Sequence, residues 1–343
     1  MRSRAVWQLS LCKMREFVRE PEAVFWVFIF PILLTLALGV AFRSKGPDPI
    51  LVGVQEGEGA SQALAALQAV PGLEVEPVAP EAARQKLREG KLTLVVIPGD
   101  PLVFWFDPTR PESRAARLEV NGALQRAAGR EDPLSVEIRE IHERGSRYID
   151  FLLPGLLGMN LMGTGMWGIG FSIVNARMRN LLKRLVATPM RKRDYLAGQL
   201  AGRAVFLFLE VGVLVGFAAL VFGVPLRGSL LTLALVSAVG AMTFAGLGLL
   251  VASRARTIEG VSGLMNAVML PMWILSGTFF STARFPDAMQ PLVQALPLTA
   301  LNDALRGVMI DGASLAVVAP EVGIAAAWGG AAFAGALYLF RWR

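Results

Sequence analysis

The chain has 343 residues, of which 54% are hydrophobic and only 18% are charged, and its mean hydropathy is +0.51. This composition excludes an ordinary soluble globular protein and predicts several membrane-spanning segments. The net charge of +7 does not indicate a nucleic-acid partner, because the excess of basic residues lies in short segments beside the apolar runs. Cys12 and His142 are the only residues of their kinds, so the chain alone forms no disulfide and no zinc site.

The first predicted element is a cytoplasmic, amphipathic helix over residues 1–20, lying in the membrane interface. Its apolar residues recur at helical spacing: Trp7, Leu11, Met14 and Val18. An adjacent stripe is basic or polar: Arg4, Gln8, Arg15 and Arg19. The alternative is a plain basic flank that anionic lipids attract.

Six apolar runs of about twenty residues are each long enough to cross roughly 30 Å of hydrocarbon as a helix. They cover residues 23–42, 151–174, 204–222, 230–252, 261–280 and 322–340. The first span, assigned to residues 21–42, could instead be a cleaved signal peptide, since Gly39 and Ala41 have the spacing of a cleavage site. The length of this run and of the segment before it favours an uncleaved anchor.

A polar segment, residues 43–149, separates the first two runs and is long enough for a folded domain. Apolar, β-rich stretches alternate in it with helix-like, alanine-rich segments. The β-rich stretches are 50–54, 73–78, 92–97 and 102–106, and the helical segments are 61–69, 81–89 and 113–128. We predict a small mixed α/β domain.

The positions of the basic residues predict the orientation. Outside residues 43–149 there are 20 Lys and Arg residues, and 17 of them fall on one side if both termini are cytoplasmic. The outer short loops then keep only Arg227, Arg284 and Arg306. We therefore predict a polytopic α-helical membrane protein with six transmembrane helices, the second to sixth within residues 150–343. The α/β domain is then extracytoplasmic, between helices 1 and 2.

The cytoplasmic loop 175–200 belongs to the most basic part of the chain, since residues 177–203 hold eight basic residues and one acidic residue. Four apolar residues follow a helical period: Met178, Leu181, Leu182 and Leu185. Pro189 ends this helix because it disfavours helical geometry at Thr188. The apolar stripe fits a protein groove or lipid, whereas the alternative is a solvated loop needed only for orientation.

Glu210 is the one ionisable residue well inside an apolar run, which makes it a functional candidate. The alternative is a structural hydrogen bond to a neighbouring helix, with Asn160, Thr164 or Asn266 as partner. Glycines are frequent in the second run, and Gly212 and Gly216 of the third have the spacing that permits close helix contact, within one subunit or between two.

Residues 281–316 are too apolar for a free loop and are predicted to form a re-entrant element on the outer side. Phe279 and Phe280 precede this segment and, together with Asp303 and Arg306, are candidates for an outer gate. Asp303 and Arg306 lie one helical turn apart and are expected to pair.

Motifs of catalytic sites are absent from the sequence: there is no phosphate-binding loop, no H-E-x-x-H, no G-x-S-x-G and no Cys/His cluster. We expect a non-catalytic protein that binds no cofactor and no metal.

Three short motifs together resemble the permease subunits of ABC-2 type export systems. They are Asp150-Phe151-Leu152-Leu153-Pro154-Gly155, Leu182-Lys183-Arg184-Leu185-Val186-Ala187-Thr188-Pro189, and Ser276-Gly277-Thr278-Phe279-Phe280 leading to Pro297-Leu298-Thr299 and Asn302-Asp303-Ala304-Leu305-Arg306. The resemblance implies a six-span subunit that forms a homodimer or heterodimer and is driven by a cytosolic ABC ATPase, which binds ATP and Mg. It implies that the ATPase contacts Arg15, Phe17, Arg19, Met178, Leu181, Leu182, Lys183, Arg184, Leu185, Thr188 and Pro189. Residues 175–180 depart from the family, whose members often carry acidic residues and a glycine there.

Three functions remain open at this level. The first is export of a hydrophobic or amphiphilic compound, such as a drug or lipid, through a bacterial inner membrane. The second is proton-coupled secondary transport that uses Glu210. The third is a membrane protein that signals or transmits force without transporting anything.

Overall fold

The computed structural model describes residues 19–42, 49–131, 134, 136–137, 147–180 and 192–339, apart from the side chains of residues 23 and 192–205. It divides into two compact units, Met1–Arg43 with His142–Arg343 and Ser44–Ile141. The predicted interfacial helix over residues 1–20 lies outside the described residues except for its last two positions.

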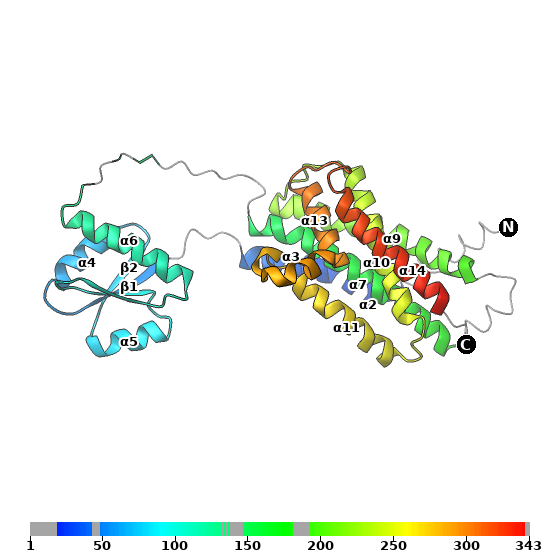
Figure 1. The fold of residues 1–343 in the computed structure, drawn as a ribbon, viewed down its shortest axis with the longest axis horizontal. Helices are drawn as coiled ribbons and strands as arrows, with labels where there is room; N and C mark the ends of the chain where they lie inside the picture. The colour runs from blue at the N-terminus through cyan, green and yellow to red at the C-terminus, as the bar shows by residue number, and fades with distance from the viewer. Residues whose placement is uncertain are drawn as a thin grey trace. The chain divides into compact units, whose positions relative to one another are not determined.

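The smaller unit contains a four-stranded sheet of order β2-β1-β3-β4 (Figure 1). Its strands are β1 (Ile50–Gln55), β2 (Leu73–Val78), β3 (Leu94–Ile97) and β4 (Val103–Phe106). β1 pairs in parallel with β2 and β3, with Val52 opposite both Val75 and Leu94, whereas β4 runs antiparallel to β3. Parallel strands need crossover connections, and helices supply them here.

Helices cover both faces of this sheet. α4 (Ala60–Gln68) and α6 (Pro111–Ala127) lie on one face, and α5 (Pro80–Arg88) lies on the other (Figure 1). The larger core, on the α4 and α6 side, includes the fully buried Val52, Leu67 and Val120. Two-sided coverage explains why β1 and β3 are apolar on both faces.

The larger unit is built from apolar helices. A helical run near the N-terminus comprises α2 (Pro21–Val24), the π-helical η1 (Phe25–Ile29) and α3 (Phe30–Ala41). The longer helices are α7 (Tyr148–Met178), α9 (Lys192–Phe222), α10 (Leu230–Ala252), α11 (Ile258–Leu275) and α14 (Ala319–Leu339). In the described part of the chain α10, α11 and α14 are long and apolar enough to cross a membrane, and the apolar parts of the α3 and α9 runs are shorter.

α7 and α10 form the centre of this unit. A Cβ on Gly165 of α7 would lie 2.9 Å from Phe244 Cβ, and a Cβ on Gly248 of α10 would lie 2.8 Å from Met166 Cα. Glycine therefore lets the two backbones touch. Gly212 and Gly216 of α9 differ, because nothing lies within 4 Å of a Cβ built on either. The close helix contact predicted for them is not made by the described residues of this chain.

The predicted re-entrant segment consists mainly of short helices. They are η2 (Thr282–Arg284), η3 (Asp287–Met289), α12 (Gln290–Ala295) and α13 (Pro297–Met309). α13 is amphipathic and buries most of its residues, among them Leu298, Leu301 and Leu305, against α7, α10 and α14. It is therefore a core element rather than a surface loop.

Candidate functional site

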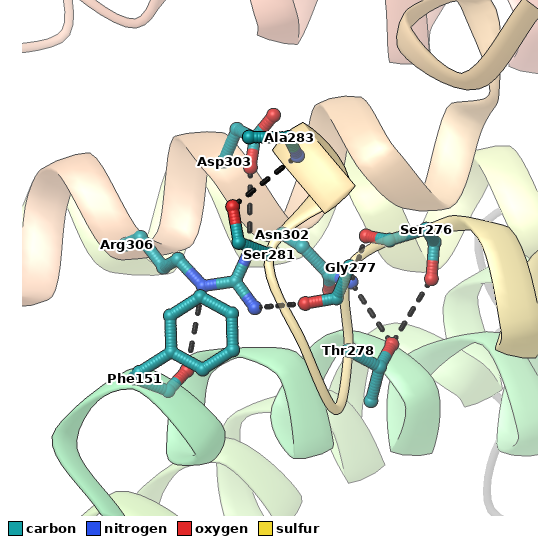
Figure 2. Close-up of polar contacts among 9 residues, drawn as sticks. All are labelled: Phe151, Ser276, Gly277, Thr278, Ser281, Ala283, Asn302, Asp303 and Arg306. Carbon is teal, nitrogen blue, oxygen red and sulfur yellow. Dashed lines mark hydrogen bonds and ion pairs between the residues drawn. The ribbon is translucent and has the colours of Figure 1, made fainter. Parts of the chain in front are cut away.

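Arg306 of α13 lies where α7 meets the segment that follows α11 (Figure 2). Its Nε donates to Phe151 O at 3.3 Å, its Nη2 donates to Gly277 O, and its Nη1 lies 3.3 Å from Asp303 Oδ1. The guanidinium carbon also stands 3.9 Å from the centre of the Phe151 ring. The Asp303–Arg306 pair predicted from their spacing is thus present.

Asn302, one turn before Arg306 and fully buried, holds the same segment. Its Nδ2 donates to Ser276 O at 3.2 Å and to Thr278 Oγ1 at 3.1 Å (Figure 2). The hydroxyls of Ser276 and Thr278 are 3.0 Å apart. These bonds pair Asn302 Nδ2 with groups of the buried Ser276 and Thr278, which fixes the turn after α11 against α13.

Glycines of α7 allow this close approach. A Cβ on Gly155 would lie 2.6 Å from Thr278 O, and one on Gly158 would overlap Asn302 Oδ1. We call the set Phe151, Gly155, Gly158, Ser276, Gly277, Thr278, Asn302, Asp303 and Arg306 the Arg306 junction. It brings together residues from two of the motifs on which the family resemblance rests, although they are far apart in the sequence.

The start of α7 is fixed beside the Arg306 junction. The fully buried Asp150 accepts two bonds from the Arg147 guanidinium, at 2.9 and 3.0 Å, and one from the Arg147 backbone N–H. Tyr148 Oη donates to Phe279 O at 2.8 Å. Phe279 therefore belongs to the packing around α7, while the ring of Phe280 packs against Phe285 at 5.6 Å. A role of these residues as a gate stays a prediction.

Glu210 of α9 is 1% exposed and contacts α7. Thr164 Oγ1 donates to its Oε1 at 3.0 Å and lies 3.4 Å from its Oε2, and Thr164 Oγ1 is also 2.8 Å from Asn160 O. Asn160 Nδ2 in turn donates to Val27 O of the π-helical η1 at 3.4 Å. Asn266 does not join this group, since it lies on the exposed side of α11. Of the three partners that the sequence leaves open for Glu210, the structure shows Thr164 in direct contact.

The predicted ATPase-coupling residues are described only in part. Arg19 and Met178 are exposed, and Met178 is the last residue of α7. The following predicted coupling residues lie outside the described residues: Arg15, Phe17, Leu181, Leu182, Lys183, Arg184, Leu185, Thr188 and Pro189. Among the described residues, no group of three or more His, Cys, Asp or Glu side chains is arranged to hold a metal ion.

Arg177 was counted from the sequence only as a basic loop residue, and its contacts were missed. The structure places it in the last turn of α7, where its guanidinium donates to backbone carbonyls at the end of α10. No local sequence signal marks such a contact, because its acceptors are backbone groups about 75 residues away.

Comparison with known proteins defines the family of this chain. Residues 22–338 match the family described as ABC-2 family transporter protein. The chain therefore belongs to this family of ABC transporter permeases.

Particular relatives share parts or most of the chain. It is 24% identical over 339 residues to the probable multidrug ABC transporter permease YbhS of Escherichia coli, covering 90% of this chain and 89% of that protein. It is 28% identical over 163 residues to the inner membrane transport permease YadH of E. coli, covering 47% of this chain and 63% of that protein. ABC transporter G family member 20 of Dictyostelium discoideum is 27% identical over 170 residues, which are 50% of this chain but 23% of that protein.

Proposed function

We propose that this protein is the transmembrane subunit of an ABC exporter and moves a hydrophobic or amphiphilic compound outward. In this proposal six helices cross a bacterial inner membrane, both termini and loop 175–200 are cytoplasmic, and the α/β domain lies outside. The spans would be the α2–α3 run, α7, α9, α10, α11 and α14. The bias of basic residues toward one side supports this arrangement.

A separate ATPase supplies the energy in this proposal. The sequence contains no phosphate-binding loop of its own, and ABC-2 permeases typically pair with an ATPase subunit. ATP and Mg would be bound by that partner. Two permease subunits, identical or different, would form the transport path between them.

The observation that carries the proposal is the continuity of α7. This single helix of 31 residues, about 46 Å long, runs from the Arg306 junction to the basic loop on which the ATPase would act. A displacement of the loop end of α7 would therefore also displace the Arg306 junction, because the helix moves as a rigid body.

The cargo is proposed from the surroundings of the path. Exposed side chains of α9 and α11, such as Phe208, Leu209 and Leu264, are apolar, and among the described residues no atom lies within 4 Å of a Cβ built on the two α9 glycines at positions 212 and 216. These surfaces suit lipid, a second subunit or an amphiphilic cargo. The relative YbhS carries the name of a probable multidrug permease, which agrees with a hydrophobic cargo.

Copurification from membranes tests the proposal. The full chain should bring down a protein with a phosphate-binding loop, and the reconstituted pair should hydrolyse ATP and release amphiphilic dyes from vesicles only when ATP is present. Dye release that persists after the ATPase is removed would contradict the proposal and favour a proton-coupled transporter. ATP hydrolysis without release of any tested amphiphile would favour signalling or force transmission.

A further inference from the structure

Arg177 connects the end of α7 with the end of α10 and the connection to α11. Its Nη1 donates to Ala252 O at 3.0 Å and also to Ala255 O, and its Nη2 donates to Ser253 O at 3.0 Å. Ala252 is the last residue of α10, Ser253 caps that helix, and Ala255 lies just before α11. One side chain thus donates to three backbone carbonyls at the end of α10 and in the segment between α10 and α11.

These three carbonyl groups are good hydrogen-bond acceptors for a guanidinium group. The last carbonyls of a helix have no partner within it and carry partial negative charge. Arginine offers several N–H donors in a planar fork and keeps its charge, whereas the ammonium of lysine is a single point donor group. Arg177 is also only partly exposed, so water competes less for its hydrogen bonds than at a fully exposed arginine.

Backbone packing extends this connection along the helices. Gly165 and Gly248 bring α7 and α10 into backbone contact, and the Met265 side chain of α11 fills the space beside Gly170. Because such packing leaves no gap, α7, α10 and the beginning of α11 resist sliding past one another. Arg177 lies at the end of this packed group, next to the loop.

Arg306 fixes the opposite end of the same helix, through its bond to Phe151 O. Phe151 and Arg177 are separated by about 39 Å along α7. α7 is therefore attached to α10 at one end and to α13 at the other.

We propose that Arg177 is a positioning residue that makes α7, α10 and the start of α11 move as one body when the adjoining loop is displaced. This inference rests on the proposed function, in which the ATPase acts on that loop. The movement is then carried by α7 to the Arg306 junction. Without Arg177 the loop can move while the end of α10 and the start of α11 stay in place. ATP hydrolysis then no longer moves the Arg306 junction.

The test measures how accessible a residue near the Arg306 junction is to a labelling reagent, so the cargo need not be known. In a chain with Cys12→Ser, a single reporter cysteine replaces the partly buried Phe280, and the complex with its copurified ATPase is placed in lipid nanodiscs. The rate of labelling by a water-soluble maleimide is compared with ATP and with ADP, and ATP hydrolysis is measured on the same sample. The variants are R177Q, R177K and, as matched control, R254Q, since Arg254 is exposed and lies in the same connection between α10 and α11.

We expect ATP to change the labelling rate of the parent protein and of R254Q alike. R177Q should reduce this ATP-induced change about ten-fold while hydrolysis stays within about two-fold, because three bonds to a charged group are lost away from the ATPase site. R177K should recover part of the change, since it retains the charge but not the fork.

Retention of the full ATP-induced change in R177Q overturns the inference. The inference is also overturned if R177Q and R177K both lose ATP hydrolysis as well as the ATP-induced change in labelling rate. Arg177 would then serve only folding or assembly. If R177Q does not assemble, R177K is judged by the same criteria. A parent protein whose labelling rate is the same with ATP and ADP contradicts the proposed function itself, and this inference with it.

Discussion

Arg306 stands over the ring of Phe151, 3.9 Å from its centre, and donates to the carbonyl of the same residue at 3.3 Å. A single side chain thereby holds the ring and the backbone of a residue 155 positions earlier in the chain. Stacking and directed hydrogen bonding together require a planar, multidentate cation.

Replacing Arg306 with lysine should therefore destabilise the larger unit by about 1.5–3 kcal/mol, the usual worth of hydrogen bonds to a charged group. Thermal unfolding in detergent, followed by tryptophan fluorescence, measures the change. Arg284→Lys is the control, because Arg284 is an exposed residue of η2 and its change should stay within about 0.5 kcal/mol. Equal shifts in the two variants would mean that the Arg306 contacts contribute nothing specific.

Gly158→Ala should disrupt the Arg306 junction, because the added Cβ would overlap Asn302 Oδ1. We expect a loss of about 1–3 kcal/mol in unfolding free energy, as for other overpacked cores. Gly163→Ala in the same helix meets open space and should be neutral or stabilising, by up to about 1 kcal/mol. The contact is disproved if both variants unfold at the same temperature.

Glu210→Gln distinguishes a structural carboxylate from a proton carrier. Glutamine keeps an oxygen that accepts from Thr164 Oγ1, so ATP-driven transport should stay within about two-fold of the original rate. Glu210→Leu removes this contact but leaves Asn160 O as an acceptor for the Thr164 hydroxyl, so it should lower stability by only about 0.5–1.5 kcal/mol. Complete loss of transport in Glu210→Gln, together with sensitivity to protonophores, would instead support the proton-coupled alternative.

The predicted apolar stripe of the basic loop can be tested by charge. Replacing Leu181 and Leu185 with Asp should leave membrane insertion intact but reduce transport per ATP hydrolysed by about ten-fold, since a buried unpaired carboxylate is costly in a protein groove. Ala187→Asp adds one negative charge on the opposite side of the predicted helix and should have little effect. Unchanged transport in the double variant would contradict the predicted contact and would mean that the loop serves only to orient the chain in the membrane.

The sheet unit has its own core and should fold without the helices. We expect residues 44–141 to show a cooperative urea transition by circular dichroism. Leu67→Ala, at a fully buried position, should lower its stability by about 2–5 kcal/mol, whereas Leu118→Ala, at a position 64% exposed, should change it by less than about 0.5 kcal/mol. A non-cooperative transition in the parent fragment would show that the unit depends on the rest of the chain.

Much of the local structure was accessible from the sequence because it depends on near neighbours. The apolar runs and the β-rich stretches coincide with helices and with strands β1 to β4, since hydrophobic periodicity is a local property. The Asp303–Arg306 pair was equally accessible, because residues one helical turn apart share a face. Which of Asn160, Thr164 and Asn266 contacts Glu210 was not accessible, because polarity alone does not tell which side of a helix faces the interior.

The sequence by itself determined the class of this protein, the bias of its basic residues and the approximate position of its apolar helices, although the fifth apolar run extends five residues beyond the end of α11. Only the tertiary structure decided that Arg306 holds Phe151, that Thr164 bonds Glu210 and that Arg177 reaches the end of α10. These contacts join segments whose separation along the chain is large, and several of their acceptors are backbone carbonyls that every residue possesses. Which of them meet depends on how the helices pack, and that packing is a property of the whole fold.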